Sequence, residues 1–262
     1  MKKIAITTFK GGTGKTTTAM NLGHGLALCG KKVLLIDCDP QGSLAASFNF
    51  DTEANLSDLL LFKKAEIVRL RRNLYGIDSG GEKLVEAQRF LARRNGNEYR
   101  LQKILTHLRE CDYVLFDCPP ALNLISMNVL LSSDHVILPV STDFLALVGV
   151  KSTLETLDEI EWTYQHRPQL LGIVATFFDS RTKISREVLS LLKEHFGKKV
   201  FRTVIRVNTQ LKECPSFHKT IFEYAPSSAG SEDYFSLTEE ILERTGDAYG
   251  RDKDIGEQEG VR

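Results

Sequence analysis

The stretch Phe-Lys-Gly-Gly-Thr-Gly-Lys-Thr-Thr, residues 9–17, decides the fold of this chain. It directly follows a strand-like run (residues 4–8) and leads straight into a run with helical periodicity (residues 16–28). Its three glycines let the backbone approach an anion closely and turn several N–H groups inward. The first turn of the following helix adds unpaired N–H groups and the positive end of its dipole. This context predicts a loop that binds phosphate.

Seven residues of this loop are candidate nucleotide ligands. The Lys15 ammonium stands where it can reach the β- and γ-phosphates, and the Thr16 hydroxyl can ligate Mg²⁺. The strict pattern of such loops begins with glycine, whereas this chain has Phe9. A glycine-rich turn with a chance lysine is the alternative, and the position between a strand and a helix argues against it. The candidates are Gly11, Gly12, Thr13, Gly14, Lys15, Thr16 and Thr17.

Short apolar, β-branched runs alternate with helical patterns along the chain. This alternation is typical of a parallel sheet covered by helices on both faces. We predict an α/β fold, a single P-loop domain over residues 1–245 whose mostly parallel, twisted sheet has about seven strands. Residues 246–262 are polar and rich in glycine, and we expect a disordered tail there. The expected strands are residues 4–8, 32–37, 71–81 (a short strand and loop), 113–117, 135–139, 170–177 and 199–203.

Composition limits the class of protein. Of the 262 residues, 42% are hydrophobic and 26% are charged, and the formal net charge is zero. A chain of this size can bury its core without disulfides, and its five cysteines form no Cys-x-x-Cys pair, which fits a reducing cytosol. No apolar run approaches the ~20 residues of a membrane span. We therefore expect a cytoplasmic protein.

Two aspartates end expected strands close to the phosphate loop. Asp37 closes the run at residues 32–37, and Asp117 closes the run at residues 113–117. At the carboxyl ends of parallel strands, a carboxylate can hold Mg²⁺ directly or through water. For a single aspartate in such a position, capping a helix is an equally good interpretation. Because three aspartates, these two and Asp39, stand at the predicted switch points, we predict a magnesium site formed by Thr16, Asp37 and Asp117.

A second lysine, Lys10, opens the loop as Lys-Gly-Gly-x-Gly-Lys-Thr-Thr, which resembles the deviant Walker A motif. That family includes ParA partition ATPases, MinD cell-division ATPases and nitrogenase iron proteins. The resemblance extends over most of residues 1–245. The segments that carry it are DCDPQ at 37–41 (like switch I), VLFDCPP at 114–120 (like Walker B and switch II), TFFDSRT at 176–182, ECPSF at 213–217 and SSAGSEDYFSL at 227–237.

The resemblance implies a Mg²⁺-dependent ATPase with three catalytic residues, Lys10, Lys15 and Asp39. Lys10 would cross the interface of an ATP-bound homodimer to contact the partner's nucleotide, where a second cation offsets phosphoryl charge. Asp39 would orient the attacking water. The residues that resemble the adenine-binding segment are Asn208, Glu213 and Pro215, although the chain departs from the family pattern between them.

Two functions within the family remain open at this stage. A ParA-type protein is a DNA-partition ATPase that binds nonspecific DNA as an ATP-bound dimer and is stimulated by a ParB-like centromere-binding protein, on the nucleoid. A MinD-type protein positions division machinery on a membrane and needs a basic, amphipathic C-terminal helix. Residues 220–262 hold four Lys/Arg against eleven Asp/Glu, which favours the ParA type. A metabolic amidoligase of the same fold is a third possibility, for which we identify no substrate-binding residues.

A basic segment, residues 181–219, is the candidate DNA-binding region. It holds ten Lys/Arg and three Asp/Glu, and contacts of this kind with phosphates are independent of sequence. Gln210 stands where the family often has an arginine, and Lys212 could substitute for it. A solvated basic surface without a partner is the alternative. The candidate residues are Arg181, Lys183, Arg186, Arg206, Lys212 and Lys219.

Overall fold

The computed structural model describes residues 1–93, 96–106, 108 and 110–247. Their strands form a single sheet in the order β3-β4-β2-β5-β1-β6-β7-β8, in which only the β3–β4 pair is antiparallel. The strands are β1 (Lys2–Ile6), β2 (Val33–Asp37), β3 (Val68–Arg71), β4 (Leu74–Ile77), β5 (Tyr113–Asp117), β6 (His135–Ser141), β7 (Gln169–Phe178) and β8 (Val200–Arg206). The predicted α/β fold with a mostly parallel sheet is confirmed.

The sheet has eight strands rather than about seven, and the additional one is β3. Two of its four residues are arginines, and none of the four is fully buried. Strand predictions rest on apolar runs, which mark strands covered on both faces. An edge strand with alternating charge shows no such run. The residues of β2 and β5, by contrast, are all buried.

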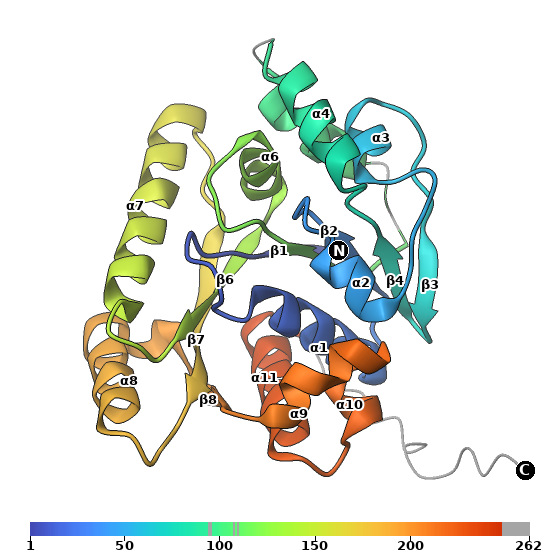
Figure 1. Ribbon diagram of the computed structural model, residues 1–262. Helices are drawn as coiled ribbons and strands as arrows, with labels where there is room; N and C mark the ends of the chain where they lie inside the picture. Colours follow the sequence, from blue (N-terminus) through green and yellow to red (C-terminus); the bar gives the residue numbers. More distant parts are fainter. Residues whose placement is uncertain (94–95, 107, 109, 248–262) are drawn as a thin grey trace, which may run out of the picture.

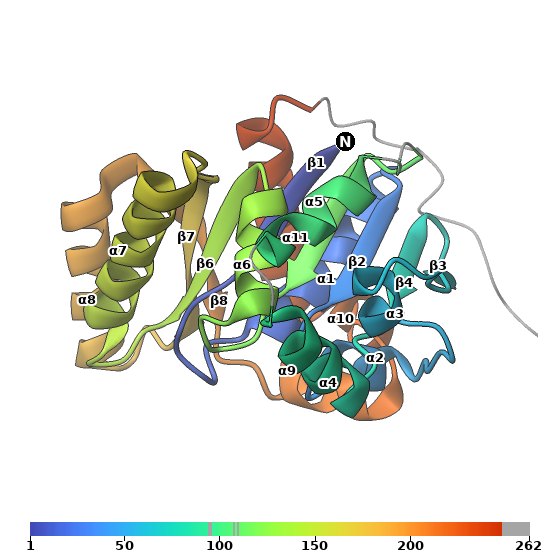
Figure 2. The ribbon, with the colours of Figure 1, turned by 90° about the horizontal axis from the view of Figure 1, so that it is seen from above.

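Helices cover both faces of the sheet (Figures 1 and 2). One core joins the sheet to α1 and α11, with Met20 and Leu237 among its buried residues. The other joins it to α3–α8, with Leu130 and Leu157 among them. The helices are α1 (Lys15–Leu28), α2 (Ser43–Phe48), α3 (Leu56–Leu60), α4 (Glu82–Leu91), α5 (Arg100–Leu105), α6 (Leu124–Ser132), α7 (Ala146–Tyr164), α8 (Lys183–Phe196), α9 (Thr209–Glu213), α10 (Ile221–Tyr224) and α11 (Ala229–Arg244), with 3-10 turns η1 (Asn97–Tyr99), η2 (Gly197–Lys199) and η3 (Cys214–Phe217).

The topology brings the predicted site residues to one edge of the sheet. β1 lies between β5 and β6, and β5 pairs on its other side with β2. Since these strands are parallel, their carboxyl ends meet where β1 runs into the phosphate loop. The crevice outside the carboxyl ends is where open α/β sheets bind ligands.

The folded part of the chain reaches slightly past the predicted boundary at residue 245. Lys2 forms an ion pair with Asp247 at 2.8 Å, and the Tyr113 hydroxyl lies 2.8 Å from the Thr245 hydroxyl. These contacts tie the end of α11 to the amino ends of β1 and β5. Of the predicted tail, residues 248–262 lie outside the described part of the chain.

Candidate nucleotide site

The predicted phosphate loop lies between β1 and α1, and two of its glycines have left-handed backbones. Gly12 has φ +71° and Gly14 has φ +87°, values that residues with a side chain rarely adopt. Gly14 is the residue before α1 and supplies no capping side chain. The first N–H groups of α1 are therefore available to an anion. An added Cβ on Gly11 or Gly12 would touch nothing within 4 Å, so the loop leaves space above its backbone.

Lys15 lies inside this loop. Its ammonium donates to the backbone oxygen of Lys10 at 3.0 Å, and the residue is buried. Burial lowers the pKa of Lys15, and the neighbouring Asp117 and Asp39 carboxylates oppose this shift. A phosphate group would provide the negative partner that a buried ammonium requires.

Two threonines beside the loop, Thr7 just after β1 and Thr176 in β7, were not among the site residues predicted from the sequence. The Thr176 hydroxyl, at the end of β7, donates to the backbone oxygen of Thr13 at 2.8 Å and braces the loop. The hydroxyl oxygens of Thr7 and Thr13 are buried and have no partner among the described residues. Buried hydroxyls without partners are rare unless a ligand or water satisfies them. Thr7 directly follows β1 and lies two residues before the quoted loop, and this place at the end of the first expected strand was the signal available in the sequence.

Asp117 has a buried carboxylate whose two oxygens lack hydrogen-bond partners in the described part of the chain. Burial raises its pKa to about 7, and Thr16 and the Lys15 charge act in the opposite direction. A hard divalent cation prefers oxygen ligands, and its positive charge would offset the unfavourable free energy of burying the negative charge of this carboxylate. The Asp117 carboxylate and the Thr16 hydroxyl thus fit Mg²⁺.

Asp37 is fully buried and has a different environment. Its Oδ1 accepts from the backbone N–H of Asp39 at 3.1 Å, and its Oδ2 accepts from those of Leu44 at 3.0 Å and Ala45 at 3.1 Å. Burial and the neighbouring Asp117 raise its pKa well above the usual range. Asp37, itself predicted as a magnesium ligand, therefore caps the first turn of α2 and lies next to Asp117.

Asp39 stands in the turn between β2 and α2, half-buried. Its Oδ1 accepts from the backbone N–H of Gln41 at 3.0 Å, and its charge acts on Lys15. Such a position beside the phosphate loop suits a residue that orients water.

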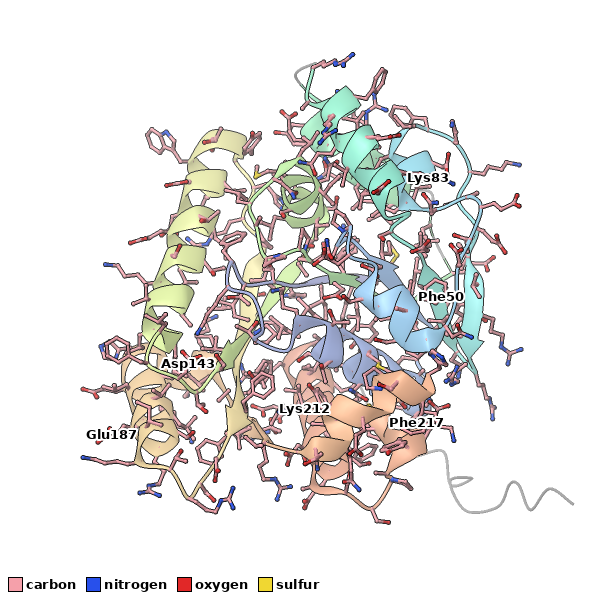
Figure 3. The ribbon with its side chains drawn as sticks, in the orientation of Figure 1. Phe50, Lys83, Asp143, Glu187, Lys212 and Phe217 are labelled. Atoms are coloured by element: carbon pink, nitrogen blue, oxygen red, sulfur yellow. The ribbon has the colours of Figure 1, made fainter. Side chains whose placement is uncertain are left out.

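Lys10 is held within its own chain. Its ammonium contacts both carboxylate oxygens of Asp143, at 2.6 and 2.7 Å, and Ser141 Oγ at 3.5 Å. The Ser141 hydroxyl donates to Asp143 at 2.5 Å. Figure 3 shows Asp143 at the start of α7. Nothing in the sequence pointed to Asp143, because it lies 133 residues from Lys10.

The predicted adenine-binding residues lie in and just before α9 and η3, a segment that packs against α2 and α10. Asn208 caps α9 by accepting from the Leu211 N–H at 3.2 Å, and Glu213 accepts from the Tyr224 hydroxyl at 3.0 Å. Pro215 lies in η3. These bonds use the Asn208 Oδ1 and one Glu213 carboxylate oxygen, whereas the N–H₂ group of Asn208 takes part in neither.

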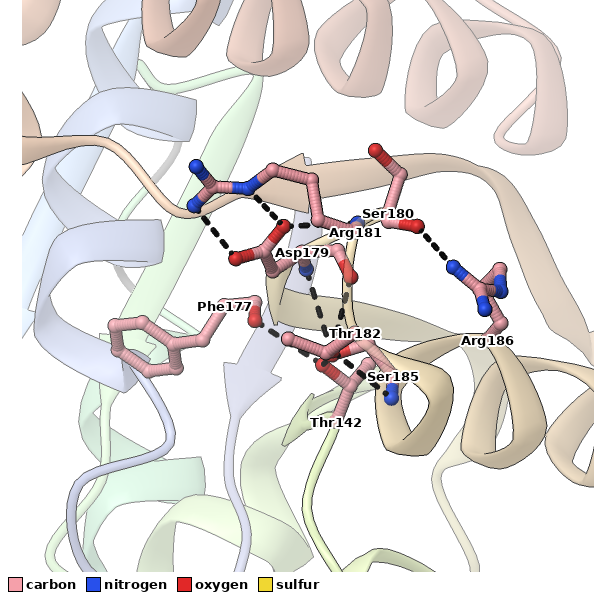
Figure 4. Close-up of polar contacts among 8 residues, drawn as sticks. All are labelled: Thr142, Phe177, Asp179, Ser180, Arg181, Thr182, Ser185 and Arg186. Carbon is pink, nitrogen blue, oxygen red and sulfur yellow. Dashed lines mark hydrogen bonds and ion pairs between the residues drawn. The ribbon is translucent and has the colours of Figure 1, made fainter.

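The six candidate DNA-binding residues divide into two groups. Arg206 contacts the buried Asp233 and the exposed Glu232, each at 2.6 Å. Arg181 and Lys183 also pair with carboxylates, those of Asp179 at 2.8 Å and Glu187 at 3.4 Å. Figure 4 shows Arg181 folded onto Asp179, with Arg186 bound to the Ser180 backbone oxygen at 2.6 Å. Of the six candidates, Arg186, Lys212 and Lys219 are exposed and have no carboxylate partner in the described part of the chain.

The loop, the parallel sheet and the strand-end carboxylates together define a P-loop nucleoside triphosphatase. A family model described as an AAA domain matches residues 1–170. The chromosome-partitioning ATPase Soj of Thermus thermophilus is 39% identical over 95% of this chain and 98% of its own length. The chromosome partitioning protein ParA of Caulobacter vibrioides is 35% identical over 94% of this chain and 96% of its own.

Solved structures share the fold. Cobyrinic acid a,c-diamide synthase of Mycobacterium smegmatis, with bound ATP analogue and magnesium, has a TM-score of 0.80 at 28% identity, covering 94% of this chain and 96% of that one. McdA of Cyanothece, in complex with ATP, has a TM-score of 0.83 at 26% identity, covering 95% and 97%. The chain belongs to the ParA/Soj family of P-loop ATPases. The predictions of the family, of ATPase activity and of ATP and Mg²⁺ as cofactors are confirmed. Within the described residues, no helix is both long and apolar enough to cross a bilayer.

Proposed function

We propose that this protein is a DNA-partition ATPase that works as an ATP-driven dimer switch. The ATP-bound dimer binds nonspecific DNA on the nucleoid, and a ParB-like centromere-binding protein stimulates its slow hydrolysis. The observation that supports this most is the 39% identity with Soj along nearly the whole of both chains. The diamide synthase, whose function is metabolic, is less similar at 28%. A membrane-bound MinD-like role is less well supported, because the C-terminal region is acidic.

Dimerisation requires Lys10 to leave its present partner. For Lys10 to reach a nucleotide on a second subunit, its ion pair with Asp143 has to open. That contact is only partly buried, with 29% of the Lys10 side chain and 48% of the Asp143 side chain exposed. An ion pair so exposed to solvent is weak. The γ-phosphate of ATP can therefore compete with Asp143 for the lysine.

We expect Arg186, Lys212 and Lys219 to contribute most to DNA binding. A cation already paired with a carboxylate gains less from a phosphate than an unpaired one does, because the existing pair has to be given up. Arg206 is expected to contribute least, since it neutralises the buried Asp233. Affinity should fall steeply with salt and depend little on sequence.

Binding of random duplex DNA by the ATP-loaded Asp39→Ala protein tests this proposal. Charge reversal in Lys212→Glu should weaken binding and flatten its salt dependence. Lys198→Glu is the matched control, because Lys198 is also exposed but lies just before β8, at the amino ends of the parallel strands and away from the nucleotide site. If the ATP-bound protein fails to bind DNA even at low salt, the DNA-binding part of the proposal is wrong.

A further inference from the structure

Asp37 and Asp117 form a matched pair. They face each other in register on the adjacent parallel strands β2 and β5, and both are buried. We infer that Asp37 is a positioning residue that fixes the turn between β2 and α2. Of the two aspartates, Asp117 is the one that binds Mg²⁺. This division of roles does not depend on whether the protein binds DNA.

The hydrogen bonds of Asp37 are the first argument. Both of its oxygens accept from backbone N–H groups, one from Asp39 and the other from Leu44 and Ala45. Gly42, the residue before α2, has no side chain to cap the helix. Asp37 therefore supplies the cap from outside the helix and satisfies N–H groups that the first turn leaves open.

Asp117 provides the contrast. Its two oxygens are as deeply buried as those of Asp37, yet among the described residues they accept no hydrogen bond from a backbone N–H, and the Thr16 hydroxyl lies near enough to lower the pKa of the carboxyl. A carboxylate with free lone pairs beside the Thr16 hydroxyl is suited to a cation. A carboxylate already committed to three N–H groups would have to release them, at the cost of leaving buried donors unpaired.

The position of Asp39 depends on these contacts. Its own N–H is bound by Asp37, and the N–H of Gly42 donates to the Asp39 backbone oxygen at 2.9 Å. In Asp37→Asn the amide offers one acceptor oxygen in place of two. Either Asp39 or the Leu44–Ala45 pair then loses its acceptor, and the turn that presents Asp39 loosens. We expect slower hydrolysis with little change in the affinity for ATP and Mg²⁺.

Binding of a fluorescent ATP analogue, with Mg²⁺ or with EDTA, separates the two roles. Mg²⁺ should increase the affinity for the analogue. In Asp37→Asn this increase should stay within about two-fold of the wild-type value, whereas in Asp117→Asn it should fall at least about ten-fold, because a metal contact is lost. For Asp37→Asn, kcat should fall by at least about ten-fold while KM changes little, because only positioning is lost. Equal loss of the Mg²⁺ effect in both variants would overturn the inference.

Hydrogen exchange in the wild-type protein covers the case in which Asp37→Asn fails to fold. The amides of Leu44 and Ala45 should exchange slowly without Mg²⁺ and keep that rate with Mg²⁺ and ADP. If Mg²⁺ instead drew Asp37 away as a ligand, these two amides would exchange faster on its addition, and the inference would be wrong.

Discussion

Replacing Asp143 by asparagine should tighten the ATP-bound dimer that we propose. Asparagine keeps an oxygen that can accept from the N–H of Leu145, as Asp143 does at 2.9 Å, so the start of α7 is preserved. The substitution removes the charge that holds Lys10. A partly exposed ion pair of this kind is worth about 1 kcal/mol. A dimer releases two such pairs, which gives about 2 kcal/mol, or a Kd for dimerisation about 30-fold lower.

Sedimentation velocity across a concentration series, with ATP and in the Asp39→Ala background, measures this Kd. The matched control is Asp158→Asn, because Asp158 pairs with Arg167 at 2.5 Å further along the same helix. With ADP, both variants should remain monomeric, since the γ-phosphate that Lys10 would contact is absent. A dimer of the Asp143→Asn protein no tighter than that of the control would refute the idea that Asp143 restrains Lys10.

Three further predictions concern the same fold. Lys15→Ala should abolish ATP binding, whereas Asp39→Ala should keep binding and stall turnover, which a binding assay paired with phosphate release distinguishes. Arg206→Ala should lower stability by about 2 kcal/mol because it leaves the buried Asp233 without its cation, and denaturant unfolding measures this loss. The pKa of Asp117 is raised in the folded protein to about 7, so its burial opposes folding once it ionises. The melting temperature of the nucleotide-free protein should therefore rise as the pH falls from 8 towards 5, and Asp117→Asn should flatten that rise.

The sequence predicted the parts of this protein that depend on local order. The phosphate loop could be predicted because its parts are adjacent in the sequence: the strand, the glycines, Lys15 and the helix follow one another, and each supports the interpretation of the next. The strands β2 and β5 could be read because strands buried on both faces are uniformly apolar. The charged edge strand β3 lacked that pattern.

Long-range partners account for what the sequence could not predict. Whether Arg206 can meet DNA depends on Asp233, 27 residues away along the chain, and a count of charges within residues 181–219 does not include that carboxylate. For a single strand-end aspartate, capping and metal binding were equally good interpretations, and the occurrence of several such aspartates led us to predict Asp37 as a magnesium ligand. The N–H groups of α2 distinguish them only when the turn is seen in three dimensions.

The two lysines of the loop are connected in a way that bears on the order of events. In the free protein the Lys15 ammonium donates to the Lys10 backbone oxygen, and the Lys10 ammonium is held by Asp143. A phosphate that binds Lys15 competes with the Lys10 oxygen for its protons, so nucleotide binding should loosen the backbone that carries Lys10. We therefore expect ATP to bind first and Lys10 to become available to a second subunit afterwards. Dimerisation would then follow nucleotide binding, because Lys15, which recognises phosphate, also holds the backbone of Lys10, which reaches the partner subunit.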